Sequence, residues 1–180
     1  MGGQHSIFCS QNKPKRADSP PVRARLATRP PTMASQNLRK VKTMKNEKIK
    51  ALAEFLQISK DEAQNLINNG GYLVLTDEEA DKKAEEEILN SLWAFNADFI
   101  LQHCKNADSM DCYEWDSAVE ALRDAQGKSC ESLNGLCRAL IDDIDEFVGD
   151  AIDADGRGHF ISWYDGEENE QNGFFIYRLN

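Results

Sequence analysis

No apolar stretch in this 180-residue sequence approaches the roughly 18 consecutive apolar residues that a membrane-spanning helix needs. The one apolar run near its beginning, Ile7-Phe8-Cys9, is far shorter than the core of a secretory signal. We therefore predict a cytosolic protein that has no membrane partner and keeps its thiols reduced.

Cysteine patterns that build disulfide frameworks or zinc sites are also missing. The five cysteines are odd in number, and no two of them form a CxxC pair. His103 and Cys104, with Cys112, Cys130 and Cys137, have zinc-ligand chemistry but not zinc-ligand spacing. Cys137 falls on an apolar helical stripe, which is typical of a buried and inert thiol. We expect no metal and no cofactor.

Catalytic signatures are scarce. Of the three histidines, only His103 and His159 follow residue 43, and neither belongs to a serine or cysteine nucleophile motif. There is no glycine-rich loop of the kind that holds phosphate groups. Whether the protein is an enzyme stays open, with a preference against it. The alternative is a small enzyme or metal protein that uses His159 with Asp153 and Asp155.

The segment Asp153-Ala154-Asp155-Gly156 is similar to part of a calcium-binding loop. Aligning Gly156 with the invariant glycine of such a loop places Ala151 and Ser162 at positions that need oxygen ligands. We therefore predict a glycine-rich turn leading into a hairpin, not a calcium site.

Charge divides the chain into two parts. Residues 1–43 hold nine of the 21 lysines and arginines and a single acid, Asp18, so residues 44–180 keep twelve basic and thirty acidic residues. An acidic domain of this kind repels nucleic acid and anionic membranes and favours basic partners. Direct nucleic-acid binding is therefore not expected.

The basic segment 1–43 is rich in proline, serine, arginine and glutamine, so we predict a disordered leader, with order beginning near Met44. Its start, Met1–Ser6, fits an N-myristoylation pattern, and Cys9 or the Lys13–Arg16 cluster offers a second anchoring signal. An organelle transit peptide is another interpretation. The interpretation we favour is a mis-assigned start, with Met33 or Met44 as the alternative first residue.

Residues 44–180 are predicted to form one acidic α+β domain, in which four or five helices pack on about three antiparallel strands that include a C-terminal hairpin. The helices are expected from apolar spacing and capping signals at residues 49–56, 59–69, 76–103, 115–127 and 133–148. The strands are expected at Tyr72–Leu75, His159–Tyr164 and Phe174–Arg178, with a charged hairpin loop at residues 165–173.

Two surfaces are candidates for binding. The first is acidic and combines residues near the fourth helical stripe with residues of the hairpin loop: Asp142, Asp143, Asp145, Glu146, Glu167, Glu168 and Glu170. The second is the hairpin itself, with Arg157, His159, Trp163 and Tyr164. Arg157 has the alternative of pairing with neighbouring carboxylates.

Residues 51–67 have the sequence pattern of a helix-turn-helix, with Leu56-Gln57-Ile58-Ser59 as the turn. The second helix begins with Asp61 and Glu62, which would face a polyanion unfavourably. A helical hairpin packed on the core explains the pattern equally well, and a regulator that uses this segment remains an alternative.

The sequence resembles a family of small uncharacterised phage and prophage proteins. The resemblance rests on Asp155–Ser162, Tyr164–Glu170 and Phe175–Arg178, and on Leu73–Ala80 and Ser91–Asn96 in the centre. It covers residues 44–180 and excludes the leader. It implies a bacterial host cytoplasm and an accessory role on host machinery, without any assigned catalytic residues.

Taken together, these observations predict a non-enzymatic accessory protein that binds a host protein, with its oligomeric state open. A sharper version is an acidic mimic of nucleic acid that occupies a nucleic-acid-binding cleft, as inhibitors of restriction or CRISPR systems do.

Overall fold

The computed structural model describes residues 33–180, with side chains from residue 40 onward. Its α-helices are α1 (Met33–Leu56), α2 (Lys60–Asn68), α3 (Asp77–Asn90), α4 (Ala97–Gln102), α5 (Cys112–Ser129), α6 (Asn134–Leu140) and α7 (Ile144–Ile161). The strands are β1 (Tyr72–Leu75), β2 (Asn169–Gln171) and β3 (Phe174–Arg178). The described part of the chain also has three short 3-10 turns, η1 (Leu92–Ala94), η2 (Ala107–Ser109) and η3 (Cys130–Leu133). The predicted α+β class is confirmed. Within the described residues, no helix combines the length and apolar character of a membrane span.

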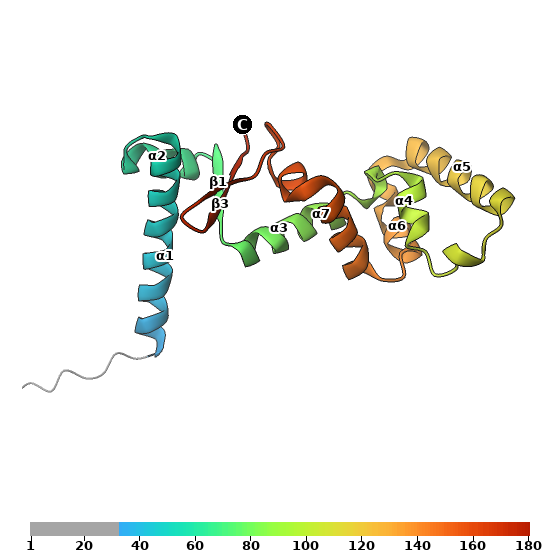
Figure 1. The fold of residues 1–180 in the computed structure, drawn as a ribbon, viewed down its shortest axis with the longest axis horizontal. Coiled ribbons are helices and arrows are strands. Elements are labelled where there is room, and N and C mark those ends of the chain that lie inside the picture. Colours follow the sequence, from blue (N-terminus) through green and yellow to red (C-terminus); the bar gives the residue numbers. More distant parts are fainter. Residues whose placement is uncertain (1–32) are drawn as a thin grey trace, which may run out of the picture.

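Figure 1 shows an elongated molecule in which α1, α2 and the sheet lie at one end and α4, α5 and α6 at the other. Helices α3 and α7 pack against each other between the two ends. The central helix pair therefore carries the connection between them.

The sheet is antiparallel in the order β1-β3-β2, which places β3 in the centre. Leu75 pairs with Phe175, and Gln171 pairs with Phe174 across the hairpin. Asn172 and Gly173 form the turn with φ of 56° and 76°, the left-handed geometry that two-residue hairpins require.

The predicted strand at His159–Tyr164 is wrong, because α7 continues to Ile161 and the hairpin takes its first strand from the predicted loop. The predicted turn at residues 155–158 also lies inside α7, as a kink at Gly156 with φ 77° and ψ 154°. Phe147, Ala151, Gly158 and Ile161 are the buried positions of α7, and their spacing is helical. Burial along one helical face therefore prevails over the local strand preference of the aromatic residues.

Helix α1 begins at Met33, earlier in the chain than Met44, near which order was predicted to begin. Residues 33–43 contain no proline or glycine, so nothing in them interrupts a helix. Among the side chains described, from residue 40 onward, the first buried one is Ile49, and Val41 is exposed, so packing starts close to where the apolar spacing placed it. The proposed acylation motif, Cys9 and the Lys13–Arg16 cluster lie outside the described residues.

The predicted helix at residues 76–103 is interrupted between α3 and α4. The Ser91 hydroxyl donates to the Glu87 carbonyl oxygen at 2.7 Å, and Asn96 caps α4 by accepting from the Asp98 N–H. The Gln126 side-chain amide donates to the carbonyl oxygens of Trp93 and Phe95 at 2.8 and 2.7 Å. These distant side chains satisfy the backbone where the helix breaks.

The predicted helix at residues 133–148 is likewise divided between α6 and α7, where Asp143 caps the second helix. The capping signals expected at the starts of α2 and α3 are confirmed at Ser59 and Thr76, and in both cases the side chains form a capping box, with Glu62 and Glu79 respectively.

Three apolar clusters form the core. One lies among α4, α5, α6, the end of α3 and α7, and a second lies among α1, α2, β1 and β3. The third is small and consists of Ala80, Ala84, Ile161 and Tyr177, which join α3, α7 and β3. The small alanines let α3 lie close to α7, and this third cluster links the two ends of the molecule.

Candidate functional site

The predicted acidic residues do not form one surface. Asp142, Asp143, Asp145 and Glu146 lie at the beginning of α7, whereas Glu167, Glu168 and Glu170 follow its end, in and before β2. Asp143 accepts hydrogen bonds from the backbone N–H groups of Asp145 and Glu146 at 3.0 and 3.1 Å. Its carboxylate therefore stabilises the helix start.

Arg157, predicted on the hairpin surface, is instead an internal connection whose side chain is only 12% exposed. Its guanidinium donates to Asp77 at 2.8 Å, to Asp81 at 2.7 Å and to both carboxylate oxygens of Glu168 at 2.9 and 3.0 Å. It also lies 4.4 Å from the centre of the Phe175 ring. The alternative that Arg157 pairs with neighbouring carboxylates is confirmed, and Glu168 is correspondingly engaged.

Tyr177, buried beneath this cluster, donates its hydroxyl to Glu168. Burial and the neighbouring Glu168 carboxylate raise the pKa of the Tyr177 hydroxyl well above its ordinary value. The hydrogen bonds that Arg157 donates to carboxylates, first to Glu168 and then to Asp77 and Asp81, raise the pKa of its guanidinium. Both groups keep their protons, so this cluster is suited to holding segments of the fold together.

A second acidic feature is formed by α3 and α7 together. A groove of about 430 Å³ is lined by carboxylates from α3, by Asp145 from α7 and by an apolar floor of Val148 and Ile152. The α3 residues at this groove, all exposed, are Glu78, Asp81, Lys82 and Glu85. The Asp81 carboxylate also forms an ion pair with Arg157. We call this feature the α3–α7 groove.

Of the predicted acidic surface, only Asp145 lines the α3–α7 groove. Sequence reasoning missed Glu78, Asp81 and Glu85, although their spacing of three and four residues places them on one face of a helix. The spacing of these three acids could therefore have been noticed in the sequence. The sequence could not show which helix faces them, because that follows from the contact between α3 and α7.

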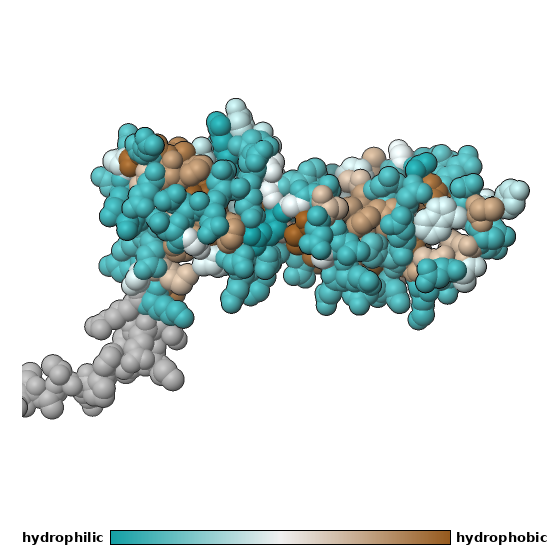
Figure 2. Space-filling model, in the orientation of Figure 1, coloured by the Kyte–Doolittle hydropathy of each residue, from teal (hydrophilic) through white to brown (hydrophobic). Residues whose placement is uncertain are grey.

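Figure 2 shows a mainly hydrophilic face in which hydrophobic patches are small. One apolar feature is a pocket of about 660 Å³ between the end of α3, η1, α4 and the second half of α7. We call it the aromatic pocket. Phe95 lies between Phe99 and Phe160, with ring centres 5.9 and 6.0 Å apart and interplanar angles of 21° and 19°.

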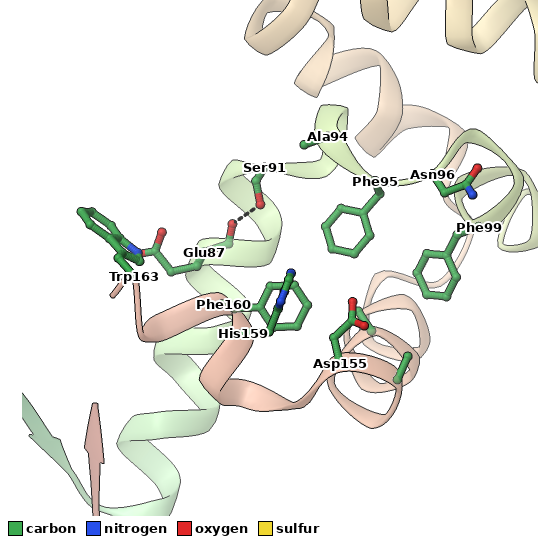
Figure 3. A pocket seen from close by; sticks show the side chains of 12 residues that line it. Glu87, Ser91, Ala94, Phe95, Asn96, Phe99, Asp155, His159, Phe160 and Trp163 are labelled. Carbon is green, nitrogen blue, oxygen red and sulfur yellow. Dashed lines mark hydrogen bonds between the residues drawn. The ribbon is translucent and has the colours of Figure 1, made fainter. Parts of the chain in front are cut away.

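Asp155 and His159 both line the aromatic pocket, and Figure 3 shows them on the α7 side, facing the space beside Phe95 and Phe160. Asp153, their predicted companion, is exposed and does not line it. Among the described residues, no hydrogen bond joins Asp155 to His159. The structure thus brings two of the three alternative catalytic residues to one pocket without forming an acid–base pair.

Trp163 borders the same pocket and is 74% exposed. Tyr164 is also exposed, and the Arg178 guanidinium lies 3.7 Å from the centre of its ring. Of the predicted hairpin surface, His159 and Trp163 therefore lie together at the aromatic pocket, whereas Arg157 is withdrawn from solvent.

The cysteines separate by environment. Cys137 is fully buried, as predicted, and Cys112 and Cys130 are exposed near opposite ends of α5. Burial raises the pKa of both the Cys104 and the Cys137 thiols. Within residues 33–180, no group of three or more histidine, cysteine or acidic side chains could hold a metal ion.

The helix-turn-helix-like segment is a helical hairpin formed by the end of α1 and by α2. Leu52, Ala53 and Ala63 belong to the apolar cluster that includes β1 and β3. Asp61 and Glu62 are exposed at the start of α2. Packing on the sheet accounts for the apolar spacing of this segment.

Comparison of the chain with protein-family models, with curated protein sequences and with solved structures gives no match.

Proposed function

We propose that this chain is a non-enzymatic binding protein that holds a basic segment of a partner protein in the α3–α7 groove. The observation that carries the proposal is the composition of the groove: four carboxylates and one lysine surround an apolar floor. Glu78, Glu85 and Asp145 are exposed and form no ion pair among the described residues. Their charge is therefore available to a partner.

The apolar floor favours a basic protein segment over simple counter-ions. Val148 and Ile152 are half-buried at the base of the groove, and they can pack against the apolar stems of lysine or arginine side chains. Electrostatic attraction from an acidic chain would also raise the rate of encounter with such a partner.

The density of charge favours a short segment over complete mimicry of nucleic acid. Glu78 and Glu85 are separated by roughly 10 Å along a helix that rises about 1.5 Å per residue. Duplex DNA carries roughly six charges over that length, at one per about 1.7 Å. The groove has four carboxylates and one opposing lysine, about half of that density. The resemblance to phage and prophage proteins makes a bacterial host protein the proposed partner.

The test uses a defined probe, an amphipathic helical peptide with lysine on its polar face and leucine on its apolar face. In a control peptide, glutamate replaces each lysine. Fluorescence anisotropy at low and moderate salt would measure its affinity for the full chain. We expect the variant Glu78→Gln/Glu85→Gln/Asp145→Asn to bind the basic peptide about tenfold more weakly, since exposed ion pairs contribute roughly 0.5 kcal/mol each and a tenfold loss corresponds to about 1.4 kcal/mol.

The matched control neutralises three exposed acids elsewhere, Asp116→Asn/Glu120→Gln/Glu131→Gln, and so changes the net charge equally. Equal loss of affinity in the two triple variants would mean that the net charge, not the groove, attracts the peptide, and the proposal would fail. The same pair of variants then separates specific from nonspecific captures when the natural partner is sought in bacterial lysate.

A further inference from the structure

The aromatic pocket lies on a different side of α7 from the α3–α7 groove, and its chemistry is different. Ala151, Ala154 and Asp155 line the pocket, whereas Asp145, Val148 and Ile152 line the groove. We propose that the aromatic pocket is a binding site for a small organic cation, in which an ammonium or amidinium group is attached to a planar apolar body.

The size and walls of the pocket suit such a body. Its volume of about 660 Å³ is within the range of small-molecule sites, which is roughly 300–1,000 Å³. The row of nearly parallel rings, Phe99, Phe95 and Phe160, presents an apolar wall beside this space, as Figure 3 shows. The exposed indole of Trp163 stands at the border, where it can cover a bound molecule.

Charge decides which ligand class fits. Asp155 projects toward the space between the rings, and among the described residues its carboxylate has no hydrogen-bond or ion-pair partner. Glu87 also lines the pocket, but it is paired with Lys83 at 2.7 Å. No lysine or arginine is among the described lining residues. An anion would therefore meet an unpaired carboxylate, whereas a cation would find both Asp155 and ring faces within reach.

The experiment compares three probes with one apolar body: 1-naphthylmethylammonium, 1-naphthylmethanol and 1-naphthoate. Each would be titrated into the full chain by calorimetry, with NMR shifts of the Trp163 indole and the Phe95 ring to locate binding. We expect the ammonium probe to bind about tenfold more tightly than the alcohol, and the carboxylate probe to bind most weakly.

Three variants test the assignment, and all of them change exposed positions of α7. Asp155→Asn should remove most of the difference in affinity between the ammonium and the alcohol, whereas Asp153→Asn, with the same charge change outside the pocket, should leave that difference intact. Ala154→Trp should fill the pocket and abolish binding of all three probes.

Equal affinity of the three probes, no binding of any, or unchanged ammonium binding in Asp155→Asn would overturn the proposal. The inference does not depend on the proposed function. Loss of ammonium binding in the Glu78→Gln/Glu85→Gln/Asp145→Asn variant would place the probe in the α3–α7 groove and would equally refute the assignment.

Discussion

Arg157 connects three segments that are far apart in the sequence. Its guanidinium reaches Asp77 and Asp81 at the start of α3, Glu168 before β2 and the Phe175 ring in β3. Arginine suits this position because its planar group donates in several fixed directions at once. A single side chain thus fixes the hairpin to the central helix pair.

We predict that Arg157→Ala lowers the free energy of unfolding by about 2 kcal/mol, because the largely buried Glu168 carboxylate loses its counter-charge, while the exposed partners Asp77 and Asp81 add little. Arg157→Lys should lose about half as much, since lysine retains the charge but not the two-pronged contact with Glu168. Urea denaturation followed by circular dichroism measures both changes. Arg138→Ala, at an exposed arginine of α6, is the control and should change stability by less than about 0.5 kcal/mol. An Arg157→Ala protein as stable as this control would contradict the structural role.

Helix α7 is the element whose glycines decide the local architecture. Gly156 adopts φ 77° and ψ 154°, a conformation that other residues enter only with strain. A Cβ atom at Gly158 would lie 2.4 Å from the Gly166 carbonyl oxygen and 2.9 Å from the Glu168 nitrogen, both of them backbone atoms. The end of α7 can therefore contact the loop before β2 only without a side chain at this position.

Gly158→Ala is expected to lower the free energy of unfolding by about 2–3 kcal/mol, because either α7 or the loop must move to admit the methyl group. The internal control is Gly149→Ala in the same helix, where nothing lies within 4 Å of the added atom. That change should raise the stability by up to about 1 kcal/mol through helix propensity. Thermal or urea unfolding would measure whether each substitution raises or lowers the stability. Destabilisation of equal size at the two positions would rule out the close-contact explanation.

The elements that sequence reasoning located correctly are those with determinants within a few residues. Ser59 and Glu62, and Thr76 and Glu79, form their capping boxes locally, and β1 and β3 follow from short runs of apolar and aromatic residues. The break after α3 was not predictable in this way. It is satisfied by Gln126 and by Asn134, whose side-chain amide donates to the Leu89 carbonyl oxygen and accepts from the Trp93 N–H.

The candidate sites follow the same rule. The acidic face of α3 was present in the spacing of Glu78, Asp81 and Glu85, but the groove exists only because Asp145 faces it from α7. Asp155 and His159 were predicted to act together with Asp153, which does not line the pocket, and the aromatic surroundings of the two come largely from η1 and α4.

At the scale of the whole molecule, the two larger apolar clusters are joined through the small one formed by Ala80, Ala84, Ile161 and Tyr177. Trp93 and Trp115 pack against the α4–α6 end, and Trp163 is exposed. Tryptophan fluorescence therefore reports mainly on one end, whereas far-ultraviolet circular dichroism reports on the helices of both. This separation of signals allows the coupling to be measured.

We predict that the fluorescence and dichroism transitions of the unaltered protein coincide and that Ile161→Ala separates them. Truncation of a buried isoleucine lowers the free energy of unfolding by about 2–5 kcal/mol. Here the loss falls on the small apolar cluster that joins the two ends of the molecule. Ile100→Ala, the same truncation inside the α4–α6 end, should move both transitions together. Coincident transitions in Ile161→Ala would show that the junction does not transmit cooperativity.

The position of β3 in the middle of the sheet has a consequence for the order of folding. Leu75 pairs with Phe175, about one hundred residues later, and almost everything between them is helical. Pairings across such a distance form slowly, because the loop-closing entropy is lost before the contact is gained. The intervening helices shorten this search once they pack. We therefore expect strand β1, which precedes them in the chain, to pair late in folding.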